Sequence, residues 1–343
     1  MSKKIFKQKI PICFATDDNY VPFLTVALAS LLDNASKENF YKIYVLTSHL
    51  SEENMNSIKK HKQENCSIEF VQLSKELDKV QDMFHLRDYY SKETYYRIFI
   101  PNLFPQYDKV LYLDCDITVL GDVSELYNTQ IHGYYVAAAQ EEVMQTFEVF
   151  GNYVEQADGI NRKEYFNAGI LLINCRRWRN KFIAERFVDL LNRYTFRVVQ
   201  DEDYLNVLCK GNVKKISLGW NKTSYKNDDF DDKDLKIIHW KINWRPWKYK
   251  DVLYEEHFWK YAKMTDFYER LITMRDSRTE EDKKKDELLM ENLSKMAQDD
   301  ADDPNNYYKT SGKKGFWVRF FKRIGIIIRF RLIINASIFR RKK

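Results

Sequence analysis

Short apolar runs alternate with longer stretches in which apolar residues recur every three or four positions over the first 113 residues. The short runs predict β-strands at residues 10–16, 41–47, 67–73 and 109–113. The periodic stretches predict helices at residues 23–32, 51–63 and 94–103. Strands and helices in alternation indicate an α/β fold with a mostly parallel sheet. In such folds, ligands bind beyond the carboxyl ends of the strands.

The pattern is less regular in the second half of the chain. It predicts strands at residues 166–174 and 235–240 and helices at residues 177–194 and 201–208. Charged and small polar residues dominate residues 276–312, with helical periodicity at 288–296. We therefore predict a large domain over residues 1–270, a charged linker over residues 271–312 and a separate tail over residues 313–343.

The tail differs from the rest of the chain in charge. It contains eleven Lys and Arg and no Asp or Glu, and subtracting these from the total of +6 leaves about −5 for the first 312 residues. A mildly acidic body argues against nucleic acid as a partner.

The tail is also amphipathic. Trp317, Phe320 and Ile324 share one helical face, and no uncharged run reaches the ~20 residues that span a bilayer. We expect the tail to lie on an anionic membrane surface. A nucleic-acid-binding tail and a helix packed on the protein's own body are the alternatives.

The cysteines and the first residues bear on the compartment. The five cysteines form no CxxC pair, and several lie inside apolar runs, which predicts reduced, buried thiols. The first ten residues are basic and lack the apolar stretch of a signal peptide. We expect a cytoplasmic protein attached to the inner face of the membrane, in which the sequons at Asn34 and Asn221 stay unmodified.

Two carboxylates follow directly on the strand predicted at residues 109–113. Asp114 and Asp116 are one residue apart, so in an extended chain they share a face that points into the ligand crevice. Two convergent carboxylates favour a hard cation such as Mn²⁺ or Mg²⁺, which could bridge the phosphates of a nucleotide. A solvated turn with two acids is the alternative.

A second polar cluster follows the strand predicted at residues 235–240. His239 could be a third metal ligand, and Lys241 and Arg245 could bind phosphates through charge-assisted hydrogen bonds. A histidine that only satisfies its own hydrogen bonds in the core or at the surface is the alternative.

Two further clusters carry polar groups into apolar surroundings. Asn167 and Gly169 interrupt the strand predicted at 166–174, where the glycine either permits a close backbone approach to a ligand or marks a bulge. Asp201, Glu202 and Asp203 begin a predicted helix, where acids favour the helix dipole or, alternatively, face the anomeric carbon of a sugar.

Taken in order, these motifs resemble those of glycosyltransferase family 8 over roughly residues 9–250. The matching segments are residues 14–20, 94–97, 113–116, 166–169, 201–206 and 239–247. The resemblance implies the GT-A fold, which is Rossmann-like, and a nucleotide-sugar transferase that retains the configuration of the anomeric carbon.

The resemblance also implies roles for individual residues. The implied metal ligands are Asp114, Asp116 and His239. The implied nucleotide- and donor-binding residues, besides Asp114 and Asp116, are Ala15, Asp17, Asn19, Arg97, Cys115, Asn167, Gly169, Asp201 and Arg245. The implied catalytic residues are Asn167, Asp201 and Glu202, and Glu141 stands near the position of an acid that faces the sugar in relatives.

Three positions depart from the family pattern. Ile242 stands where the family usually has glycine, which puts a close approach of the backbone to the pyrophosphate in doubt. Arg245 replaces a lysine and keeps the charge with a different geometry. Glu202 replaces the glutamine of many bacterial relatives, and it could attack the sugar as a nucleophile or only position it.

We therefore predict a retaining hexosyltransferase that depends on Mn²⁺ or Mg²⁺ and moves glucose or galactose from a UDP-sugar to a lipid- or protein-linked glycan acceptor. Two other classes stay open. A metal-dependent nucleotidyltransferase also pairs an α/β sheet with carboxylates, although the chain has no Gly-rich triphosphate loop. A non-catalytic membrane-bound scaffold on a transferase fold would not need to keep the acids and His239.

Overall fold

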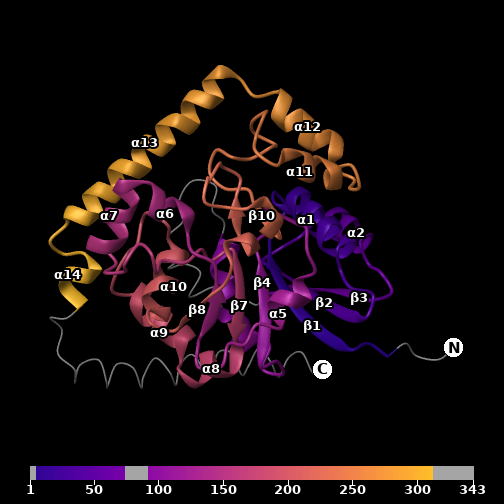
Figure 1. Cartoon of the computed structure of the whole chain (residues 1–343), viewed down its shortest axis with the longest axis horizontal. Coiled ribbons are helices and arrows are strands. Elements are labelled where there is room, and N and C mark those ends of the chain that lie inside the picture. Colours follow the sequence, from indigo (N-terminus) through magenta and orange to yellow (C-terminus); the bar gives the residue numbers. More distant parts are fainter. Residues whose placement is uncertain (1–4, 74–91, 312–343) are drawn as a thin grey trace.

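The computed structural model describes residues 5–73 and 92–311. Its main feature is a seven-stranded sheet in the order β3, β2, β1, β4, β7, β6, β8. The strands in that order are Cys66–Gln72, Asn39–Thr47, Gln8–Ala15, Lys109–Leu113, Ile170–Asn174, Val136–Ala138 and Val213–Lys215. Strands β3, β2, β1 and β4 are parallel, and β7 is antiparallel to β4 and β6. The predicted α/β fold with a mostly parallel sheet is confirmed (Figure 1).

A small second sheet brings distant residues to the end of the first. It consists of β5 (Ile117–Val119), β10 (Ile237–His239) and β9 (Lys222–Thr223). Strand β5 follows Asp116 directly, and His239 pairs with Ile117 across the antiparallel ladder. This pairing carries His239 to the carboxyl end of β4.

Helices cover both faces of the main sheet. Alternate strand residues belong to two apolar clusters, as the pleat requires. One face packs on α1 (Val21–Asp33), α2 (Glu52–Lys59) and α5 (Val123–Tyr127). The other face packs on a 3₁₀ helix, η1 (Lys92–Phe99), and on α4 (Ile100–Leu103), α8 (Cys175–Asn180), α9 (Ile183–Leu191) and α10 (Asp201–Cys209).

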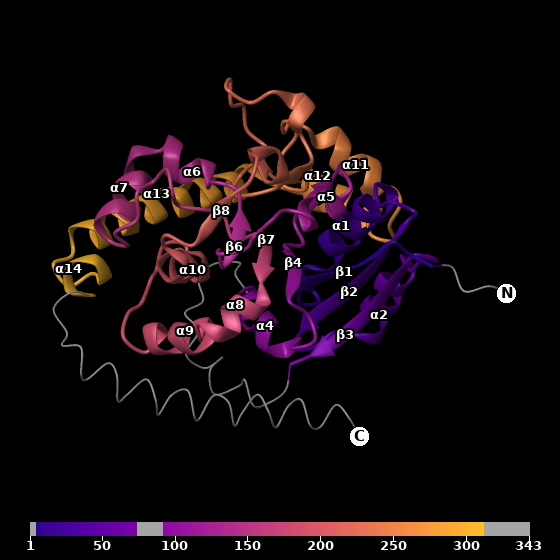
Figure 2. The ribbon, with the colours of Figure 1, turned by 60° about the horizontal axis from the view of Figure 1, so that its bottom comes forward.

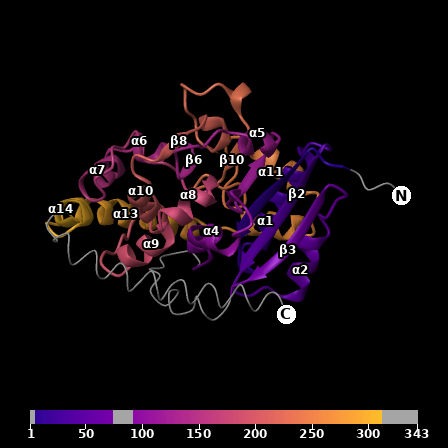
Figure 3. The same ribbon diagram turned by 90° about the horizontal axis from the view of Figure 1, so that it is seen from below.

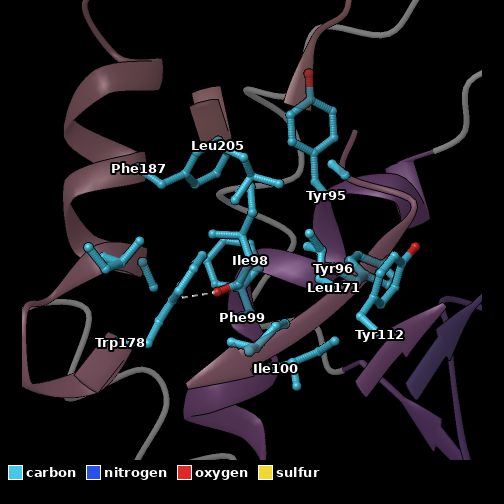
Figure 4. Close-up of a cluster of buried hydrophobic side chains, with 14 of the residues drawn as sticks. Tyr95, Tyr96, Ile98, Phe99, Ile100, Tyr112, Leu171, Trp178, Phe187 and Leu205 are labelled. Atoms are coloured by element: carbon cyan, nitrogen blue, oxygen red, sulfur yellow. Dashed lines mark hydrogen bonds between the residues drawn. The ribbon is translucent and has the colours of Figure 1, made fainter. Parts of the chain in front are cut away.

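Aromatic side chains dominate the second of these faces. Figure 4 shows Trp178 donating its indole N–H to the backbone oxygen of Ile98, at 3.1 Å. The rings of Phe99 and Phe187 meet edge to face nearby, with centroids 5.8 Å apart. These contacts fix η1, which carries Arg97 toward the carboxyl end of β4. All five cysteines are buried and none forms a disulfide, as predicted.

The structure corrects several expected elements. The helix expected at residues 94–103 is the 3₁₀ helix η1 followed by the four-residue α4, and the strand expected from residue 166 begins only at Ile170. The helix expected at 177–194 is split into α8 and α9, because Phe182 has a positive φ of 53°. Helices α6 (Glu142–Thr146) and α7 (Glu148–Gln156) were not expected at all.

Four helices follow the sheet. They are α11 (Glu255–Ala262), α12 (Tyr268–Asp276), α13 (Glu280–Asp302) and α14 (Tyr307–Ser311), and short 3₁₀ helices precede them at Leu218–Trp220 and Asp232–Asp234. The region expected to be a charged linker thus contains α13, which begins at a capping box of Thr279 and Asp282. In Figures 1 and 2, α13 runs alongside α7 and α6 and reaches α12.

The two halves of the sheet have different neighbours. Figure 3 shows β2, β3 and α2 at one end of the molecule and α9, α13 and α14 at the other.

The amphipathic tail predicted at residues 313–343 lies outside the described residues, and the division into domain, linker and tail stays a prediction. In the part of the chain that the structure describes, no helix is both long and apolar enough to cross a membrane.

Candidate active site

A pocket of about 190 Å³ opens at the carboxyl ends of β1 and β4. This is the edge of the sheet at which ligands of open α/β folds bind. Of the residues proposed from the sequence, the pocket is lined by Ala15, Arg97, Asp114, Cys115, Asp116, Asn167, Asp201, Glu202, His239 and Arg245. Residues from segments more than 200 positions apart therefore share one cavity.

Asp114, Asp116 and His239 form a compact group in this pocket. The Nε2 atom of His239 lies 3.4 Å from Oδ1 of Asp116 and 3.8 Å from Oδ2 of Asp114. One ligand atom from each residue lies within 4.8 Å of the other two. Asp116 and His239 are 8% and 3% exposed, so the group is largely withdrawn from water.

The charge balance of this group favours a cation. Burial raises the pKa of Asp114, and the Asp116 carboxylate adds to the shift, although Arg97 opposes it. Burial acts in the same direction on Asp116, but its pKa is lowered because His239 and Arg245 stabilise its charge. A buried carboxylate, a partly buried one and an imidazole are a donor set that Mn²⁺ or Mg²⁺ accepts.

Gly169 leaves the space that such an ion requires. Strand β7 is antiparallel to β4, so the residues before β7 lie at the carboxyl end of β4, where Asp114 donates its N–H to the backbone oxygen of Gly169 at 2.7 Å. A Cβ atom on Gly169 would lie 2.3 Å from Cε1 of His239 and 2.6 Å from Oδ2 of Asp114. Any side chain at this position would therefore displace the ligand group.

A chain of amides determines the tautomer of His239. The backbone N–H of Gly169 donates to Oδ1 of Asn167 at 2.9 Å, so this atom is an acceptor. Asn221 must then donate its Nδ2 to the same oxygen, at 2.8 Å, which turns its own Oδ1 toward Nδ1 of His239, 2.9 Å away. Nδ1 therefore donates this hydrogen bond, and Nε2 is the ring nitrogen that faces the two carboxylates.

Arg97 is enclosed by protein groups at the floor of the pocket. Its guanidinium lies 3.0 Å from Oδ1 of Asp114 and 3.1 Å from Oδ2 of Asp201. It also donates to the backbone oxygens of Thr94 and Ala168 and stacks over Tyr112, 4.6 Å from the ring centroid. Arg97 thus holds the two acids in place, and a contact with phosphate or sugar stays a prediction.

Asn167 lies at the centre of a second polar group. Its Nδ2 donates to Oε2 of Glu202 at 3.1 Å and also to Glu141, and the N–H of Ala168 donates to Oε2 of Glu202 at 2.7 Å. Lys241 pairs with Glu141 at 2.6 Å. The side chain of Asn167 thus links the metal-ligand group to the acids around Glu202.

The acids of this second group have divergent pKa values. Burial is opposed at Glu141 by the Lys241 ammonium, which lowers the pKa of Glu141. Burial and the Glu141 carboxylate raise the pKa of Glu202 well above its usual range. Burial also raises the pKa of Asp201 to about 6, despite the opposing charge of Arg97. Neighbouring buried acids whose pKa values are shifted in opposite directions are common in active sites.

Asp203 has a different position from its two neighbours. Its carboxylate accepts hydrogen bonds from the hydroxyls of Tyr153 and Tyr165 and from the N–H of Val199. It is fully buried and does not line the pocket. Asp203 therefore anchors the start of α10, on which Asp201 and Glu202 face the pocket.

The segment expected to bind the nucleoside lies at the end of β1. Ala15 lines the pocket, and its backbone oxygen is 3.2 Å from the Cys115 sulfur. Oδ1 of Asp17 accepts from the backbone N–H groups of Asn19 and Tyr20, and Asn19 is exposed. Their contact with a nucleoside stays a prediction.

Two residues near His239, Ile242 and Arg245, differ from the family pattern, and the structure shows how each is accommodated. Ile242 adopts a φ of 55°, the backbone conformation in which glycine is at ease, so the replacement of glycine keeps the turn. Arg245 is buried, with Nη2 3.5 Å from Oδ2 of Asp116 and Nε donating to the oxygen of Trp240 at 3.2 Å.

Some residues of the site were missed by reasoning from the sequence. Asn221 was considered only as an unmodified sequon, and no local pattern connects it with His239. The pocket also contains Asp286, Leu289, Met290 and Leu293 of α13, in a region expected to be a linker. Helical periodicity at 288–296 was the one signal that could have indicated them.

Comparisons with known proteins agree on one family. The model described as Glycosyl transferase family 8 matches residues 11–251. A putative glycosyltransferase of Haemophilus influenzae is 30% identical over 234 residues, covering 67% of this chain and 68% of that protein. A lipopolysaccharide 1,2-glucosyltransferase of Escherichia coli is 22% identical over 285 residues, covering 78% and 79%.

Solved structures lead to the same fold. The galactosyltransferase LgtC, in complex with donor and acceptor sugar analogues, has a TM-score of 0.60 and 25% identity, over 75% of this chain and 96% of that one. The bifunctional glycosyltransferase WbbM has a TM-score of 0.67 and 25% sequence identity. The match covers 79% of this chain and about half (52%) of the WbbM chain. The expected GT-A fold is confirmed by these likenesses.

Proposed function

The chain belongs to glycosyltransferase family 8, and we propose that it is a retaining hexosyltransferase that moves glucose or galactose from a UDP-sugar to a glycan acceptor. The observation that carries the proposal is the group of Asp114, Asp116 and His239 at the carboxyl end of β4, in a pocket that also holds Arg245. Similarity to a lipopolysaccharide glucosyltransferase and to a galactosyltransferase supports a hexose donor.

The three ligands would hold Mn²⁺ or Mg²⁺. Such an ion, when bound, neutralises the charge that develops on a departing diphosphate. Arg245, which is buried beside Asp116, adds a fixed positive charge at the same end of the pocket. The amide of Asn221 accepts a hydrogen bond from Nδ1 of His239, which leaves Nε2 as the ring nitrogen available to a metal ion.

The acids around Asn167 would bind the sugar. Asp201 and Glu202 line the same pocket as the metal ligands, and Asn167 connects the two groups. We propose that Glu202 positions the sugar as a neutral acid, in the manner of a glutamine. Its raised pKa, caused by burial and by the Glu141 carboxylate, supports this role over that of a nucleophile, which would have to be ionised. The hydrogen bonds that it accepts from Ala168 and Asn167 hold its side chain in place.

The tail would attach the enzyme to a membrane. Its eleven basic residues, interspersed with Ile, Phe and Trp, support a helix lying in the interface of an anionic membrane at the cytoplasmic face. We expect the full chain to sediment with anionic vesicles in a salt-sensitive way and a version that ends at Ser311 to stay in solution. Equal binding by both would exclude this role of the tail.

The decisive experiment measures UDP release from UDP-glucose and UDP-galactose, with and without Mn²⁺. We expect metal-dependent release from one of them, which EDTA abolishes and Asp116→Asn reduces. Asp229→Asn, which changes an exposed acid, serves as the control. Release of pyrophosphate from a nucleoside triphosphate would instead indicate a nucleotidyltransferase, and no turnover of either kind would indicate a scaffold.

A further inference from the structure

Helix α13 forms one wall of the active-site pocket, although it lies outside the region that the family model matches. That region ends at residue 251, whereas α13 begins at Glu280. Four of its residues line the pocket, and three of them are apolar: Leu289, Met290 and Leu293, with Asp286 as the fourth. The wall is therefore a feature of this chain that the family match does not account for.

Both ends of α13 are held to the body of the protein. Near its beginning, the buried Asp286 accepts from Nζ of Lys248 at 3.1 Å, from Arg278 at 2.6 Å and from the hydroxyl of Tyr249 at 2.7 Å. Toward its end, Ala297 and Ala301 are buried. The pocket-lining residues Leu289, Met290 and Leu293 lie between these two anchors, where α13 runs beside α7 and α6 (Figures 1 and 2). A helix held in this way is a fixed wall.

The beginning of α14 strengthens the second anchor. Asn306 donates to the backbone oxygen of Gln156 at 3.0 Å, and the N–H of Tyr308 donates to that of Ala157 at 2.9 Å. Both acceptors belong to the end of α7 or directly follow it, so these bonds fasten the segment after α13 to α7.

The pocket-lining residues next to α13 are apolar as well. They are Val143 and Met144 of α6, Phe150 of α7, and Val198 and Val199 before α10. Val143, Met144, Phe150 and Val198 belong to the same apolar cluster as Ala297, and Met290, Leu293 and Val199 pack against it. This end of the pocket thus differs in chemistry from the end that holds the carboxylates and His239.

The kind of side chain decides what this end can bind. Sugar rings are recognised by convergent polar groups and by exposed aromatic faces, whereas the ring of Phe150 here is only 3% exposed. The accessible apolar side chains at this end belong to α13: Leu289 is 40% exposed, and Met290 and Leu293 are partly exposed. Branched aliphatic side chains and flexible methionines adapt instead to a hydrocarbon chain. The reacting hydroxyl of an acceptor would at the same time reach the polar end of the same pocket.

We propose that the apolar end of the pocket, between α13 and α6–α7, binds the hydrocarbon chain of an acceptor whose sugar is attached to a lipid. The proposal rests on the proposed glycosyltransferase function and adds the class of its acceptor. The apolar residues of α13 then select the acceptor, while the metal ligands and Asn167 act on the donor.

The test compares acceptor analogues that differ only in chain length. Methyl, butyl and octyl β-glucosides and β-galactosides are titrated into the full chain by calorimetry, below the micelle concentration and with UDP and Mn²⁺ present. Each methylene that enters an apolar site tightens binding by about fourfold. We expect the octyl compound to bind at least about tenfold more tightly than the methyl compound, and equal affinities would overturn the proposal.

Two leucine variants locate the binding. Leu293→Asn places a polar group in the pocket and should remove most of the preference for the octyl chain. Leu288→Asn changes a leucine that is 56% exposed and does not line the pocket, so the preference should persist. An equal effect of both substitutions would mean that the chain binds outside the pocket and would overturn the proposal.

Two controls separate this proposal from its premises. UDP release from the donor in the absence of acceptor should be unchanged in Leu288→Asn, and a failure of the wild-type chain to release UDP from any donor would refute the proposed function instead. If the basic tail rather than an acceptor occupied the apolar end, the version that ends at Ser311 would bind the octyl compound more tightly than the full chain. That result would count against the acceptor as the occupant.

Discussion

Replacing Asn221 by alanine should weaken metal binding without changing any metal ligand. The amide of Asn221 accepts a hydrogen bond from Nδ1 of His239 at 2.9 Å and donates one to Oδ1 of Asn167 at 2.8 Å. Alanine removes both bonds in a place where the asparagine is only 1% exposed. The proton of His239 is then free to move to Nε2, the nitrogen that faces the carboxylates, where it would exclude a cation.

The size of the effect follows from the bonds that are lost. Loss of the partner that orients a metal-binding histidine typically costs 10–100-fold in metal affinity, so we expect a drop of about that size. Where the proton stays on Nδ1, that N–H becomes a buried donor without a partner, which costs about 1–3 kcal/mol of stability. Oδ1 of Asn167 still accepts a hydrogen bond from the N–H of Gly169, so the loss of its bond with Asn221 costs less stability.

Calorimetric titration with Mn²⁺ and the Mn²⁺ concentration for half-maximal UDP release measure the two consequences separately. Asn221→Asp should recover most of the metal affinity, because its carboxylate accepts from Nδ1 of His239. Asn34→Ala is the matched control, since Asn34 donates to Val119 and Tyr261 away from the pocket and its loss should lower stability alone. Unchanged Mn²⁺ affinity in Asn221→Ala would refute the role of this amide.

Three further predictions concern residues around the same pocket. Asp116→Asn should lower kcat by at least about a hundredfold with the fold intact, and full activity in EDTA would contradict it. Folding raises the pKa of Glu202, so the protonated side chain stabilises the folded state relative to the ionised one. This contribution to stability is complete below the unfolded pKa of ~4.3 and is lost as the pH rises toward the pKa of the folded state. Glu202→Gln should therefore raise Tm over wild type more at about pH 8 than at about pH 4.5 and keep near-normal UDP release, whereas a folded, inactive variant would favour a nucleophile. Ile242→Gly should be about 1–2 kcal/mol more stable than Ile242→Ala in denaturant titrations, because both remove the side chain but only glycine is unstrained at a φ of 55°.

The sequence by itself determined the features that depend on local pattern. The strands up to β4 could be predicted because apolar runs of that length leave few alternatives, and the order of strands and helices indicated the parallel part of the sheet. Asp114 and Asp116 could be identified because they follow one of those strands directly. His239 could be proposed for a similar reason, since it ends another apolar strand.

Only the tertiary structure decided which groups surround these residues. The contact between Asn221 and His239 depends on the pairing of β9 with β10, and the contact of Arg97 with Asp201 joins residues 104 positions apart, as no periodicity could indicate. The two turns with positive φ at Phe182 and Ile242 occur at residues that local rules do not expect there. The polar surface of α13 suggested a linker, because the few apolar residues on its buried side become meaningful only when α7 and the pocket lie against them.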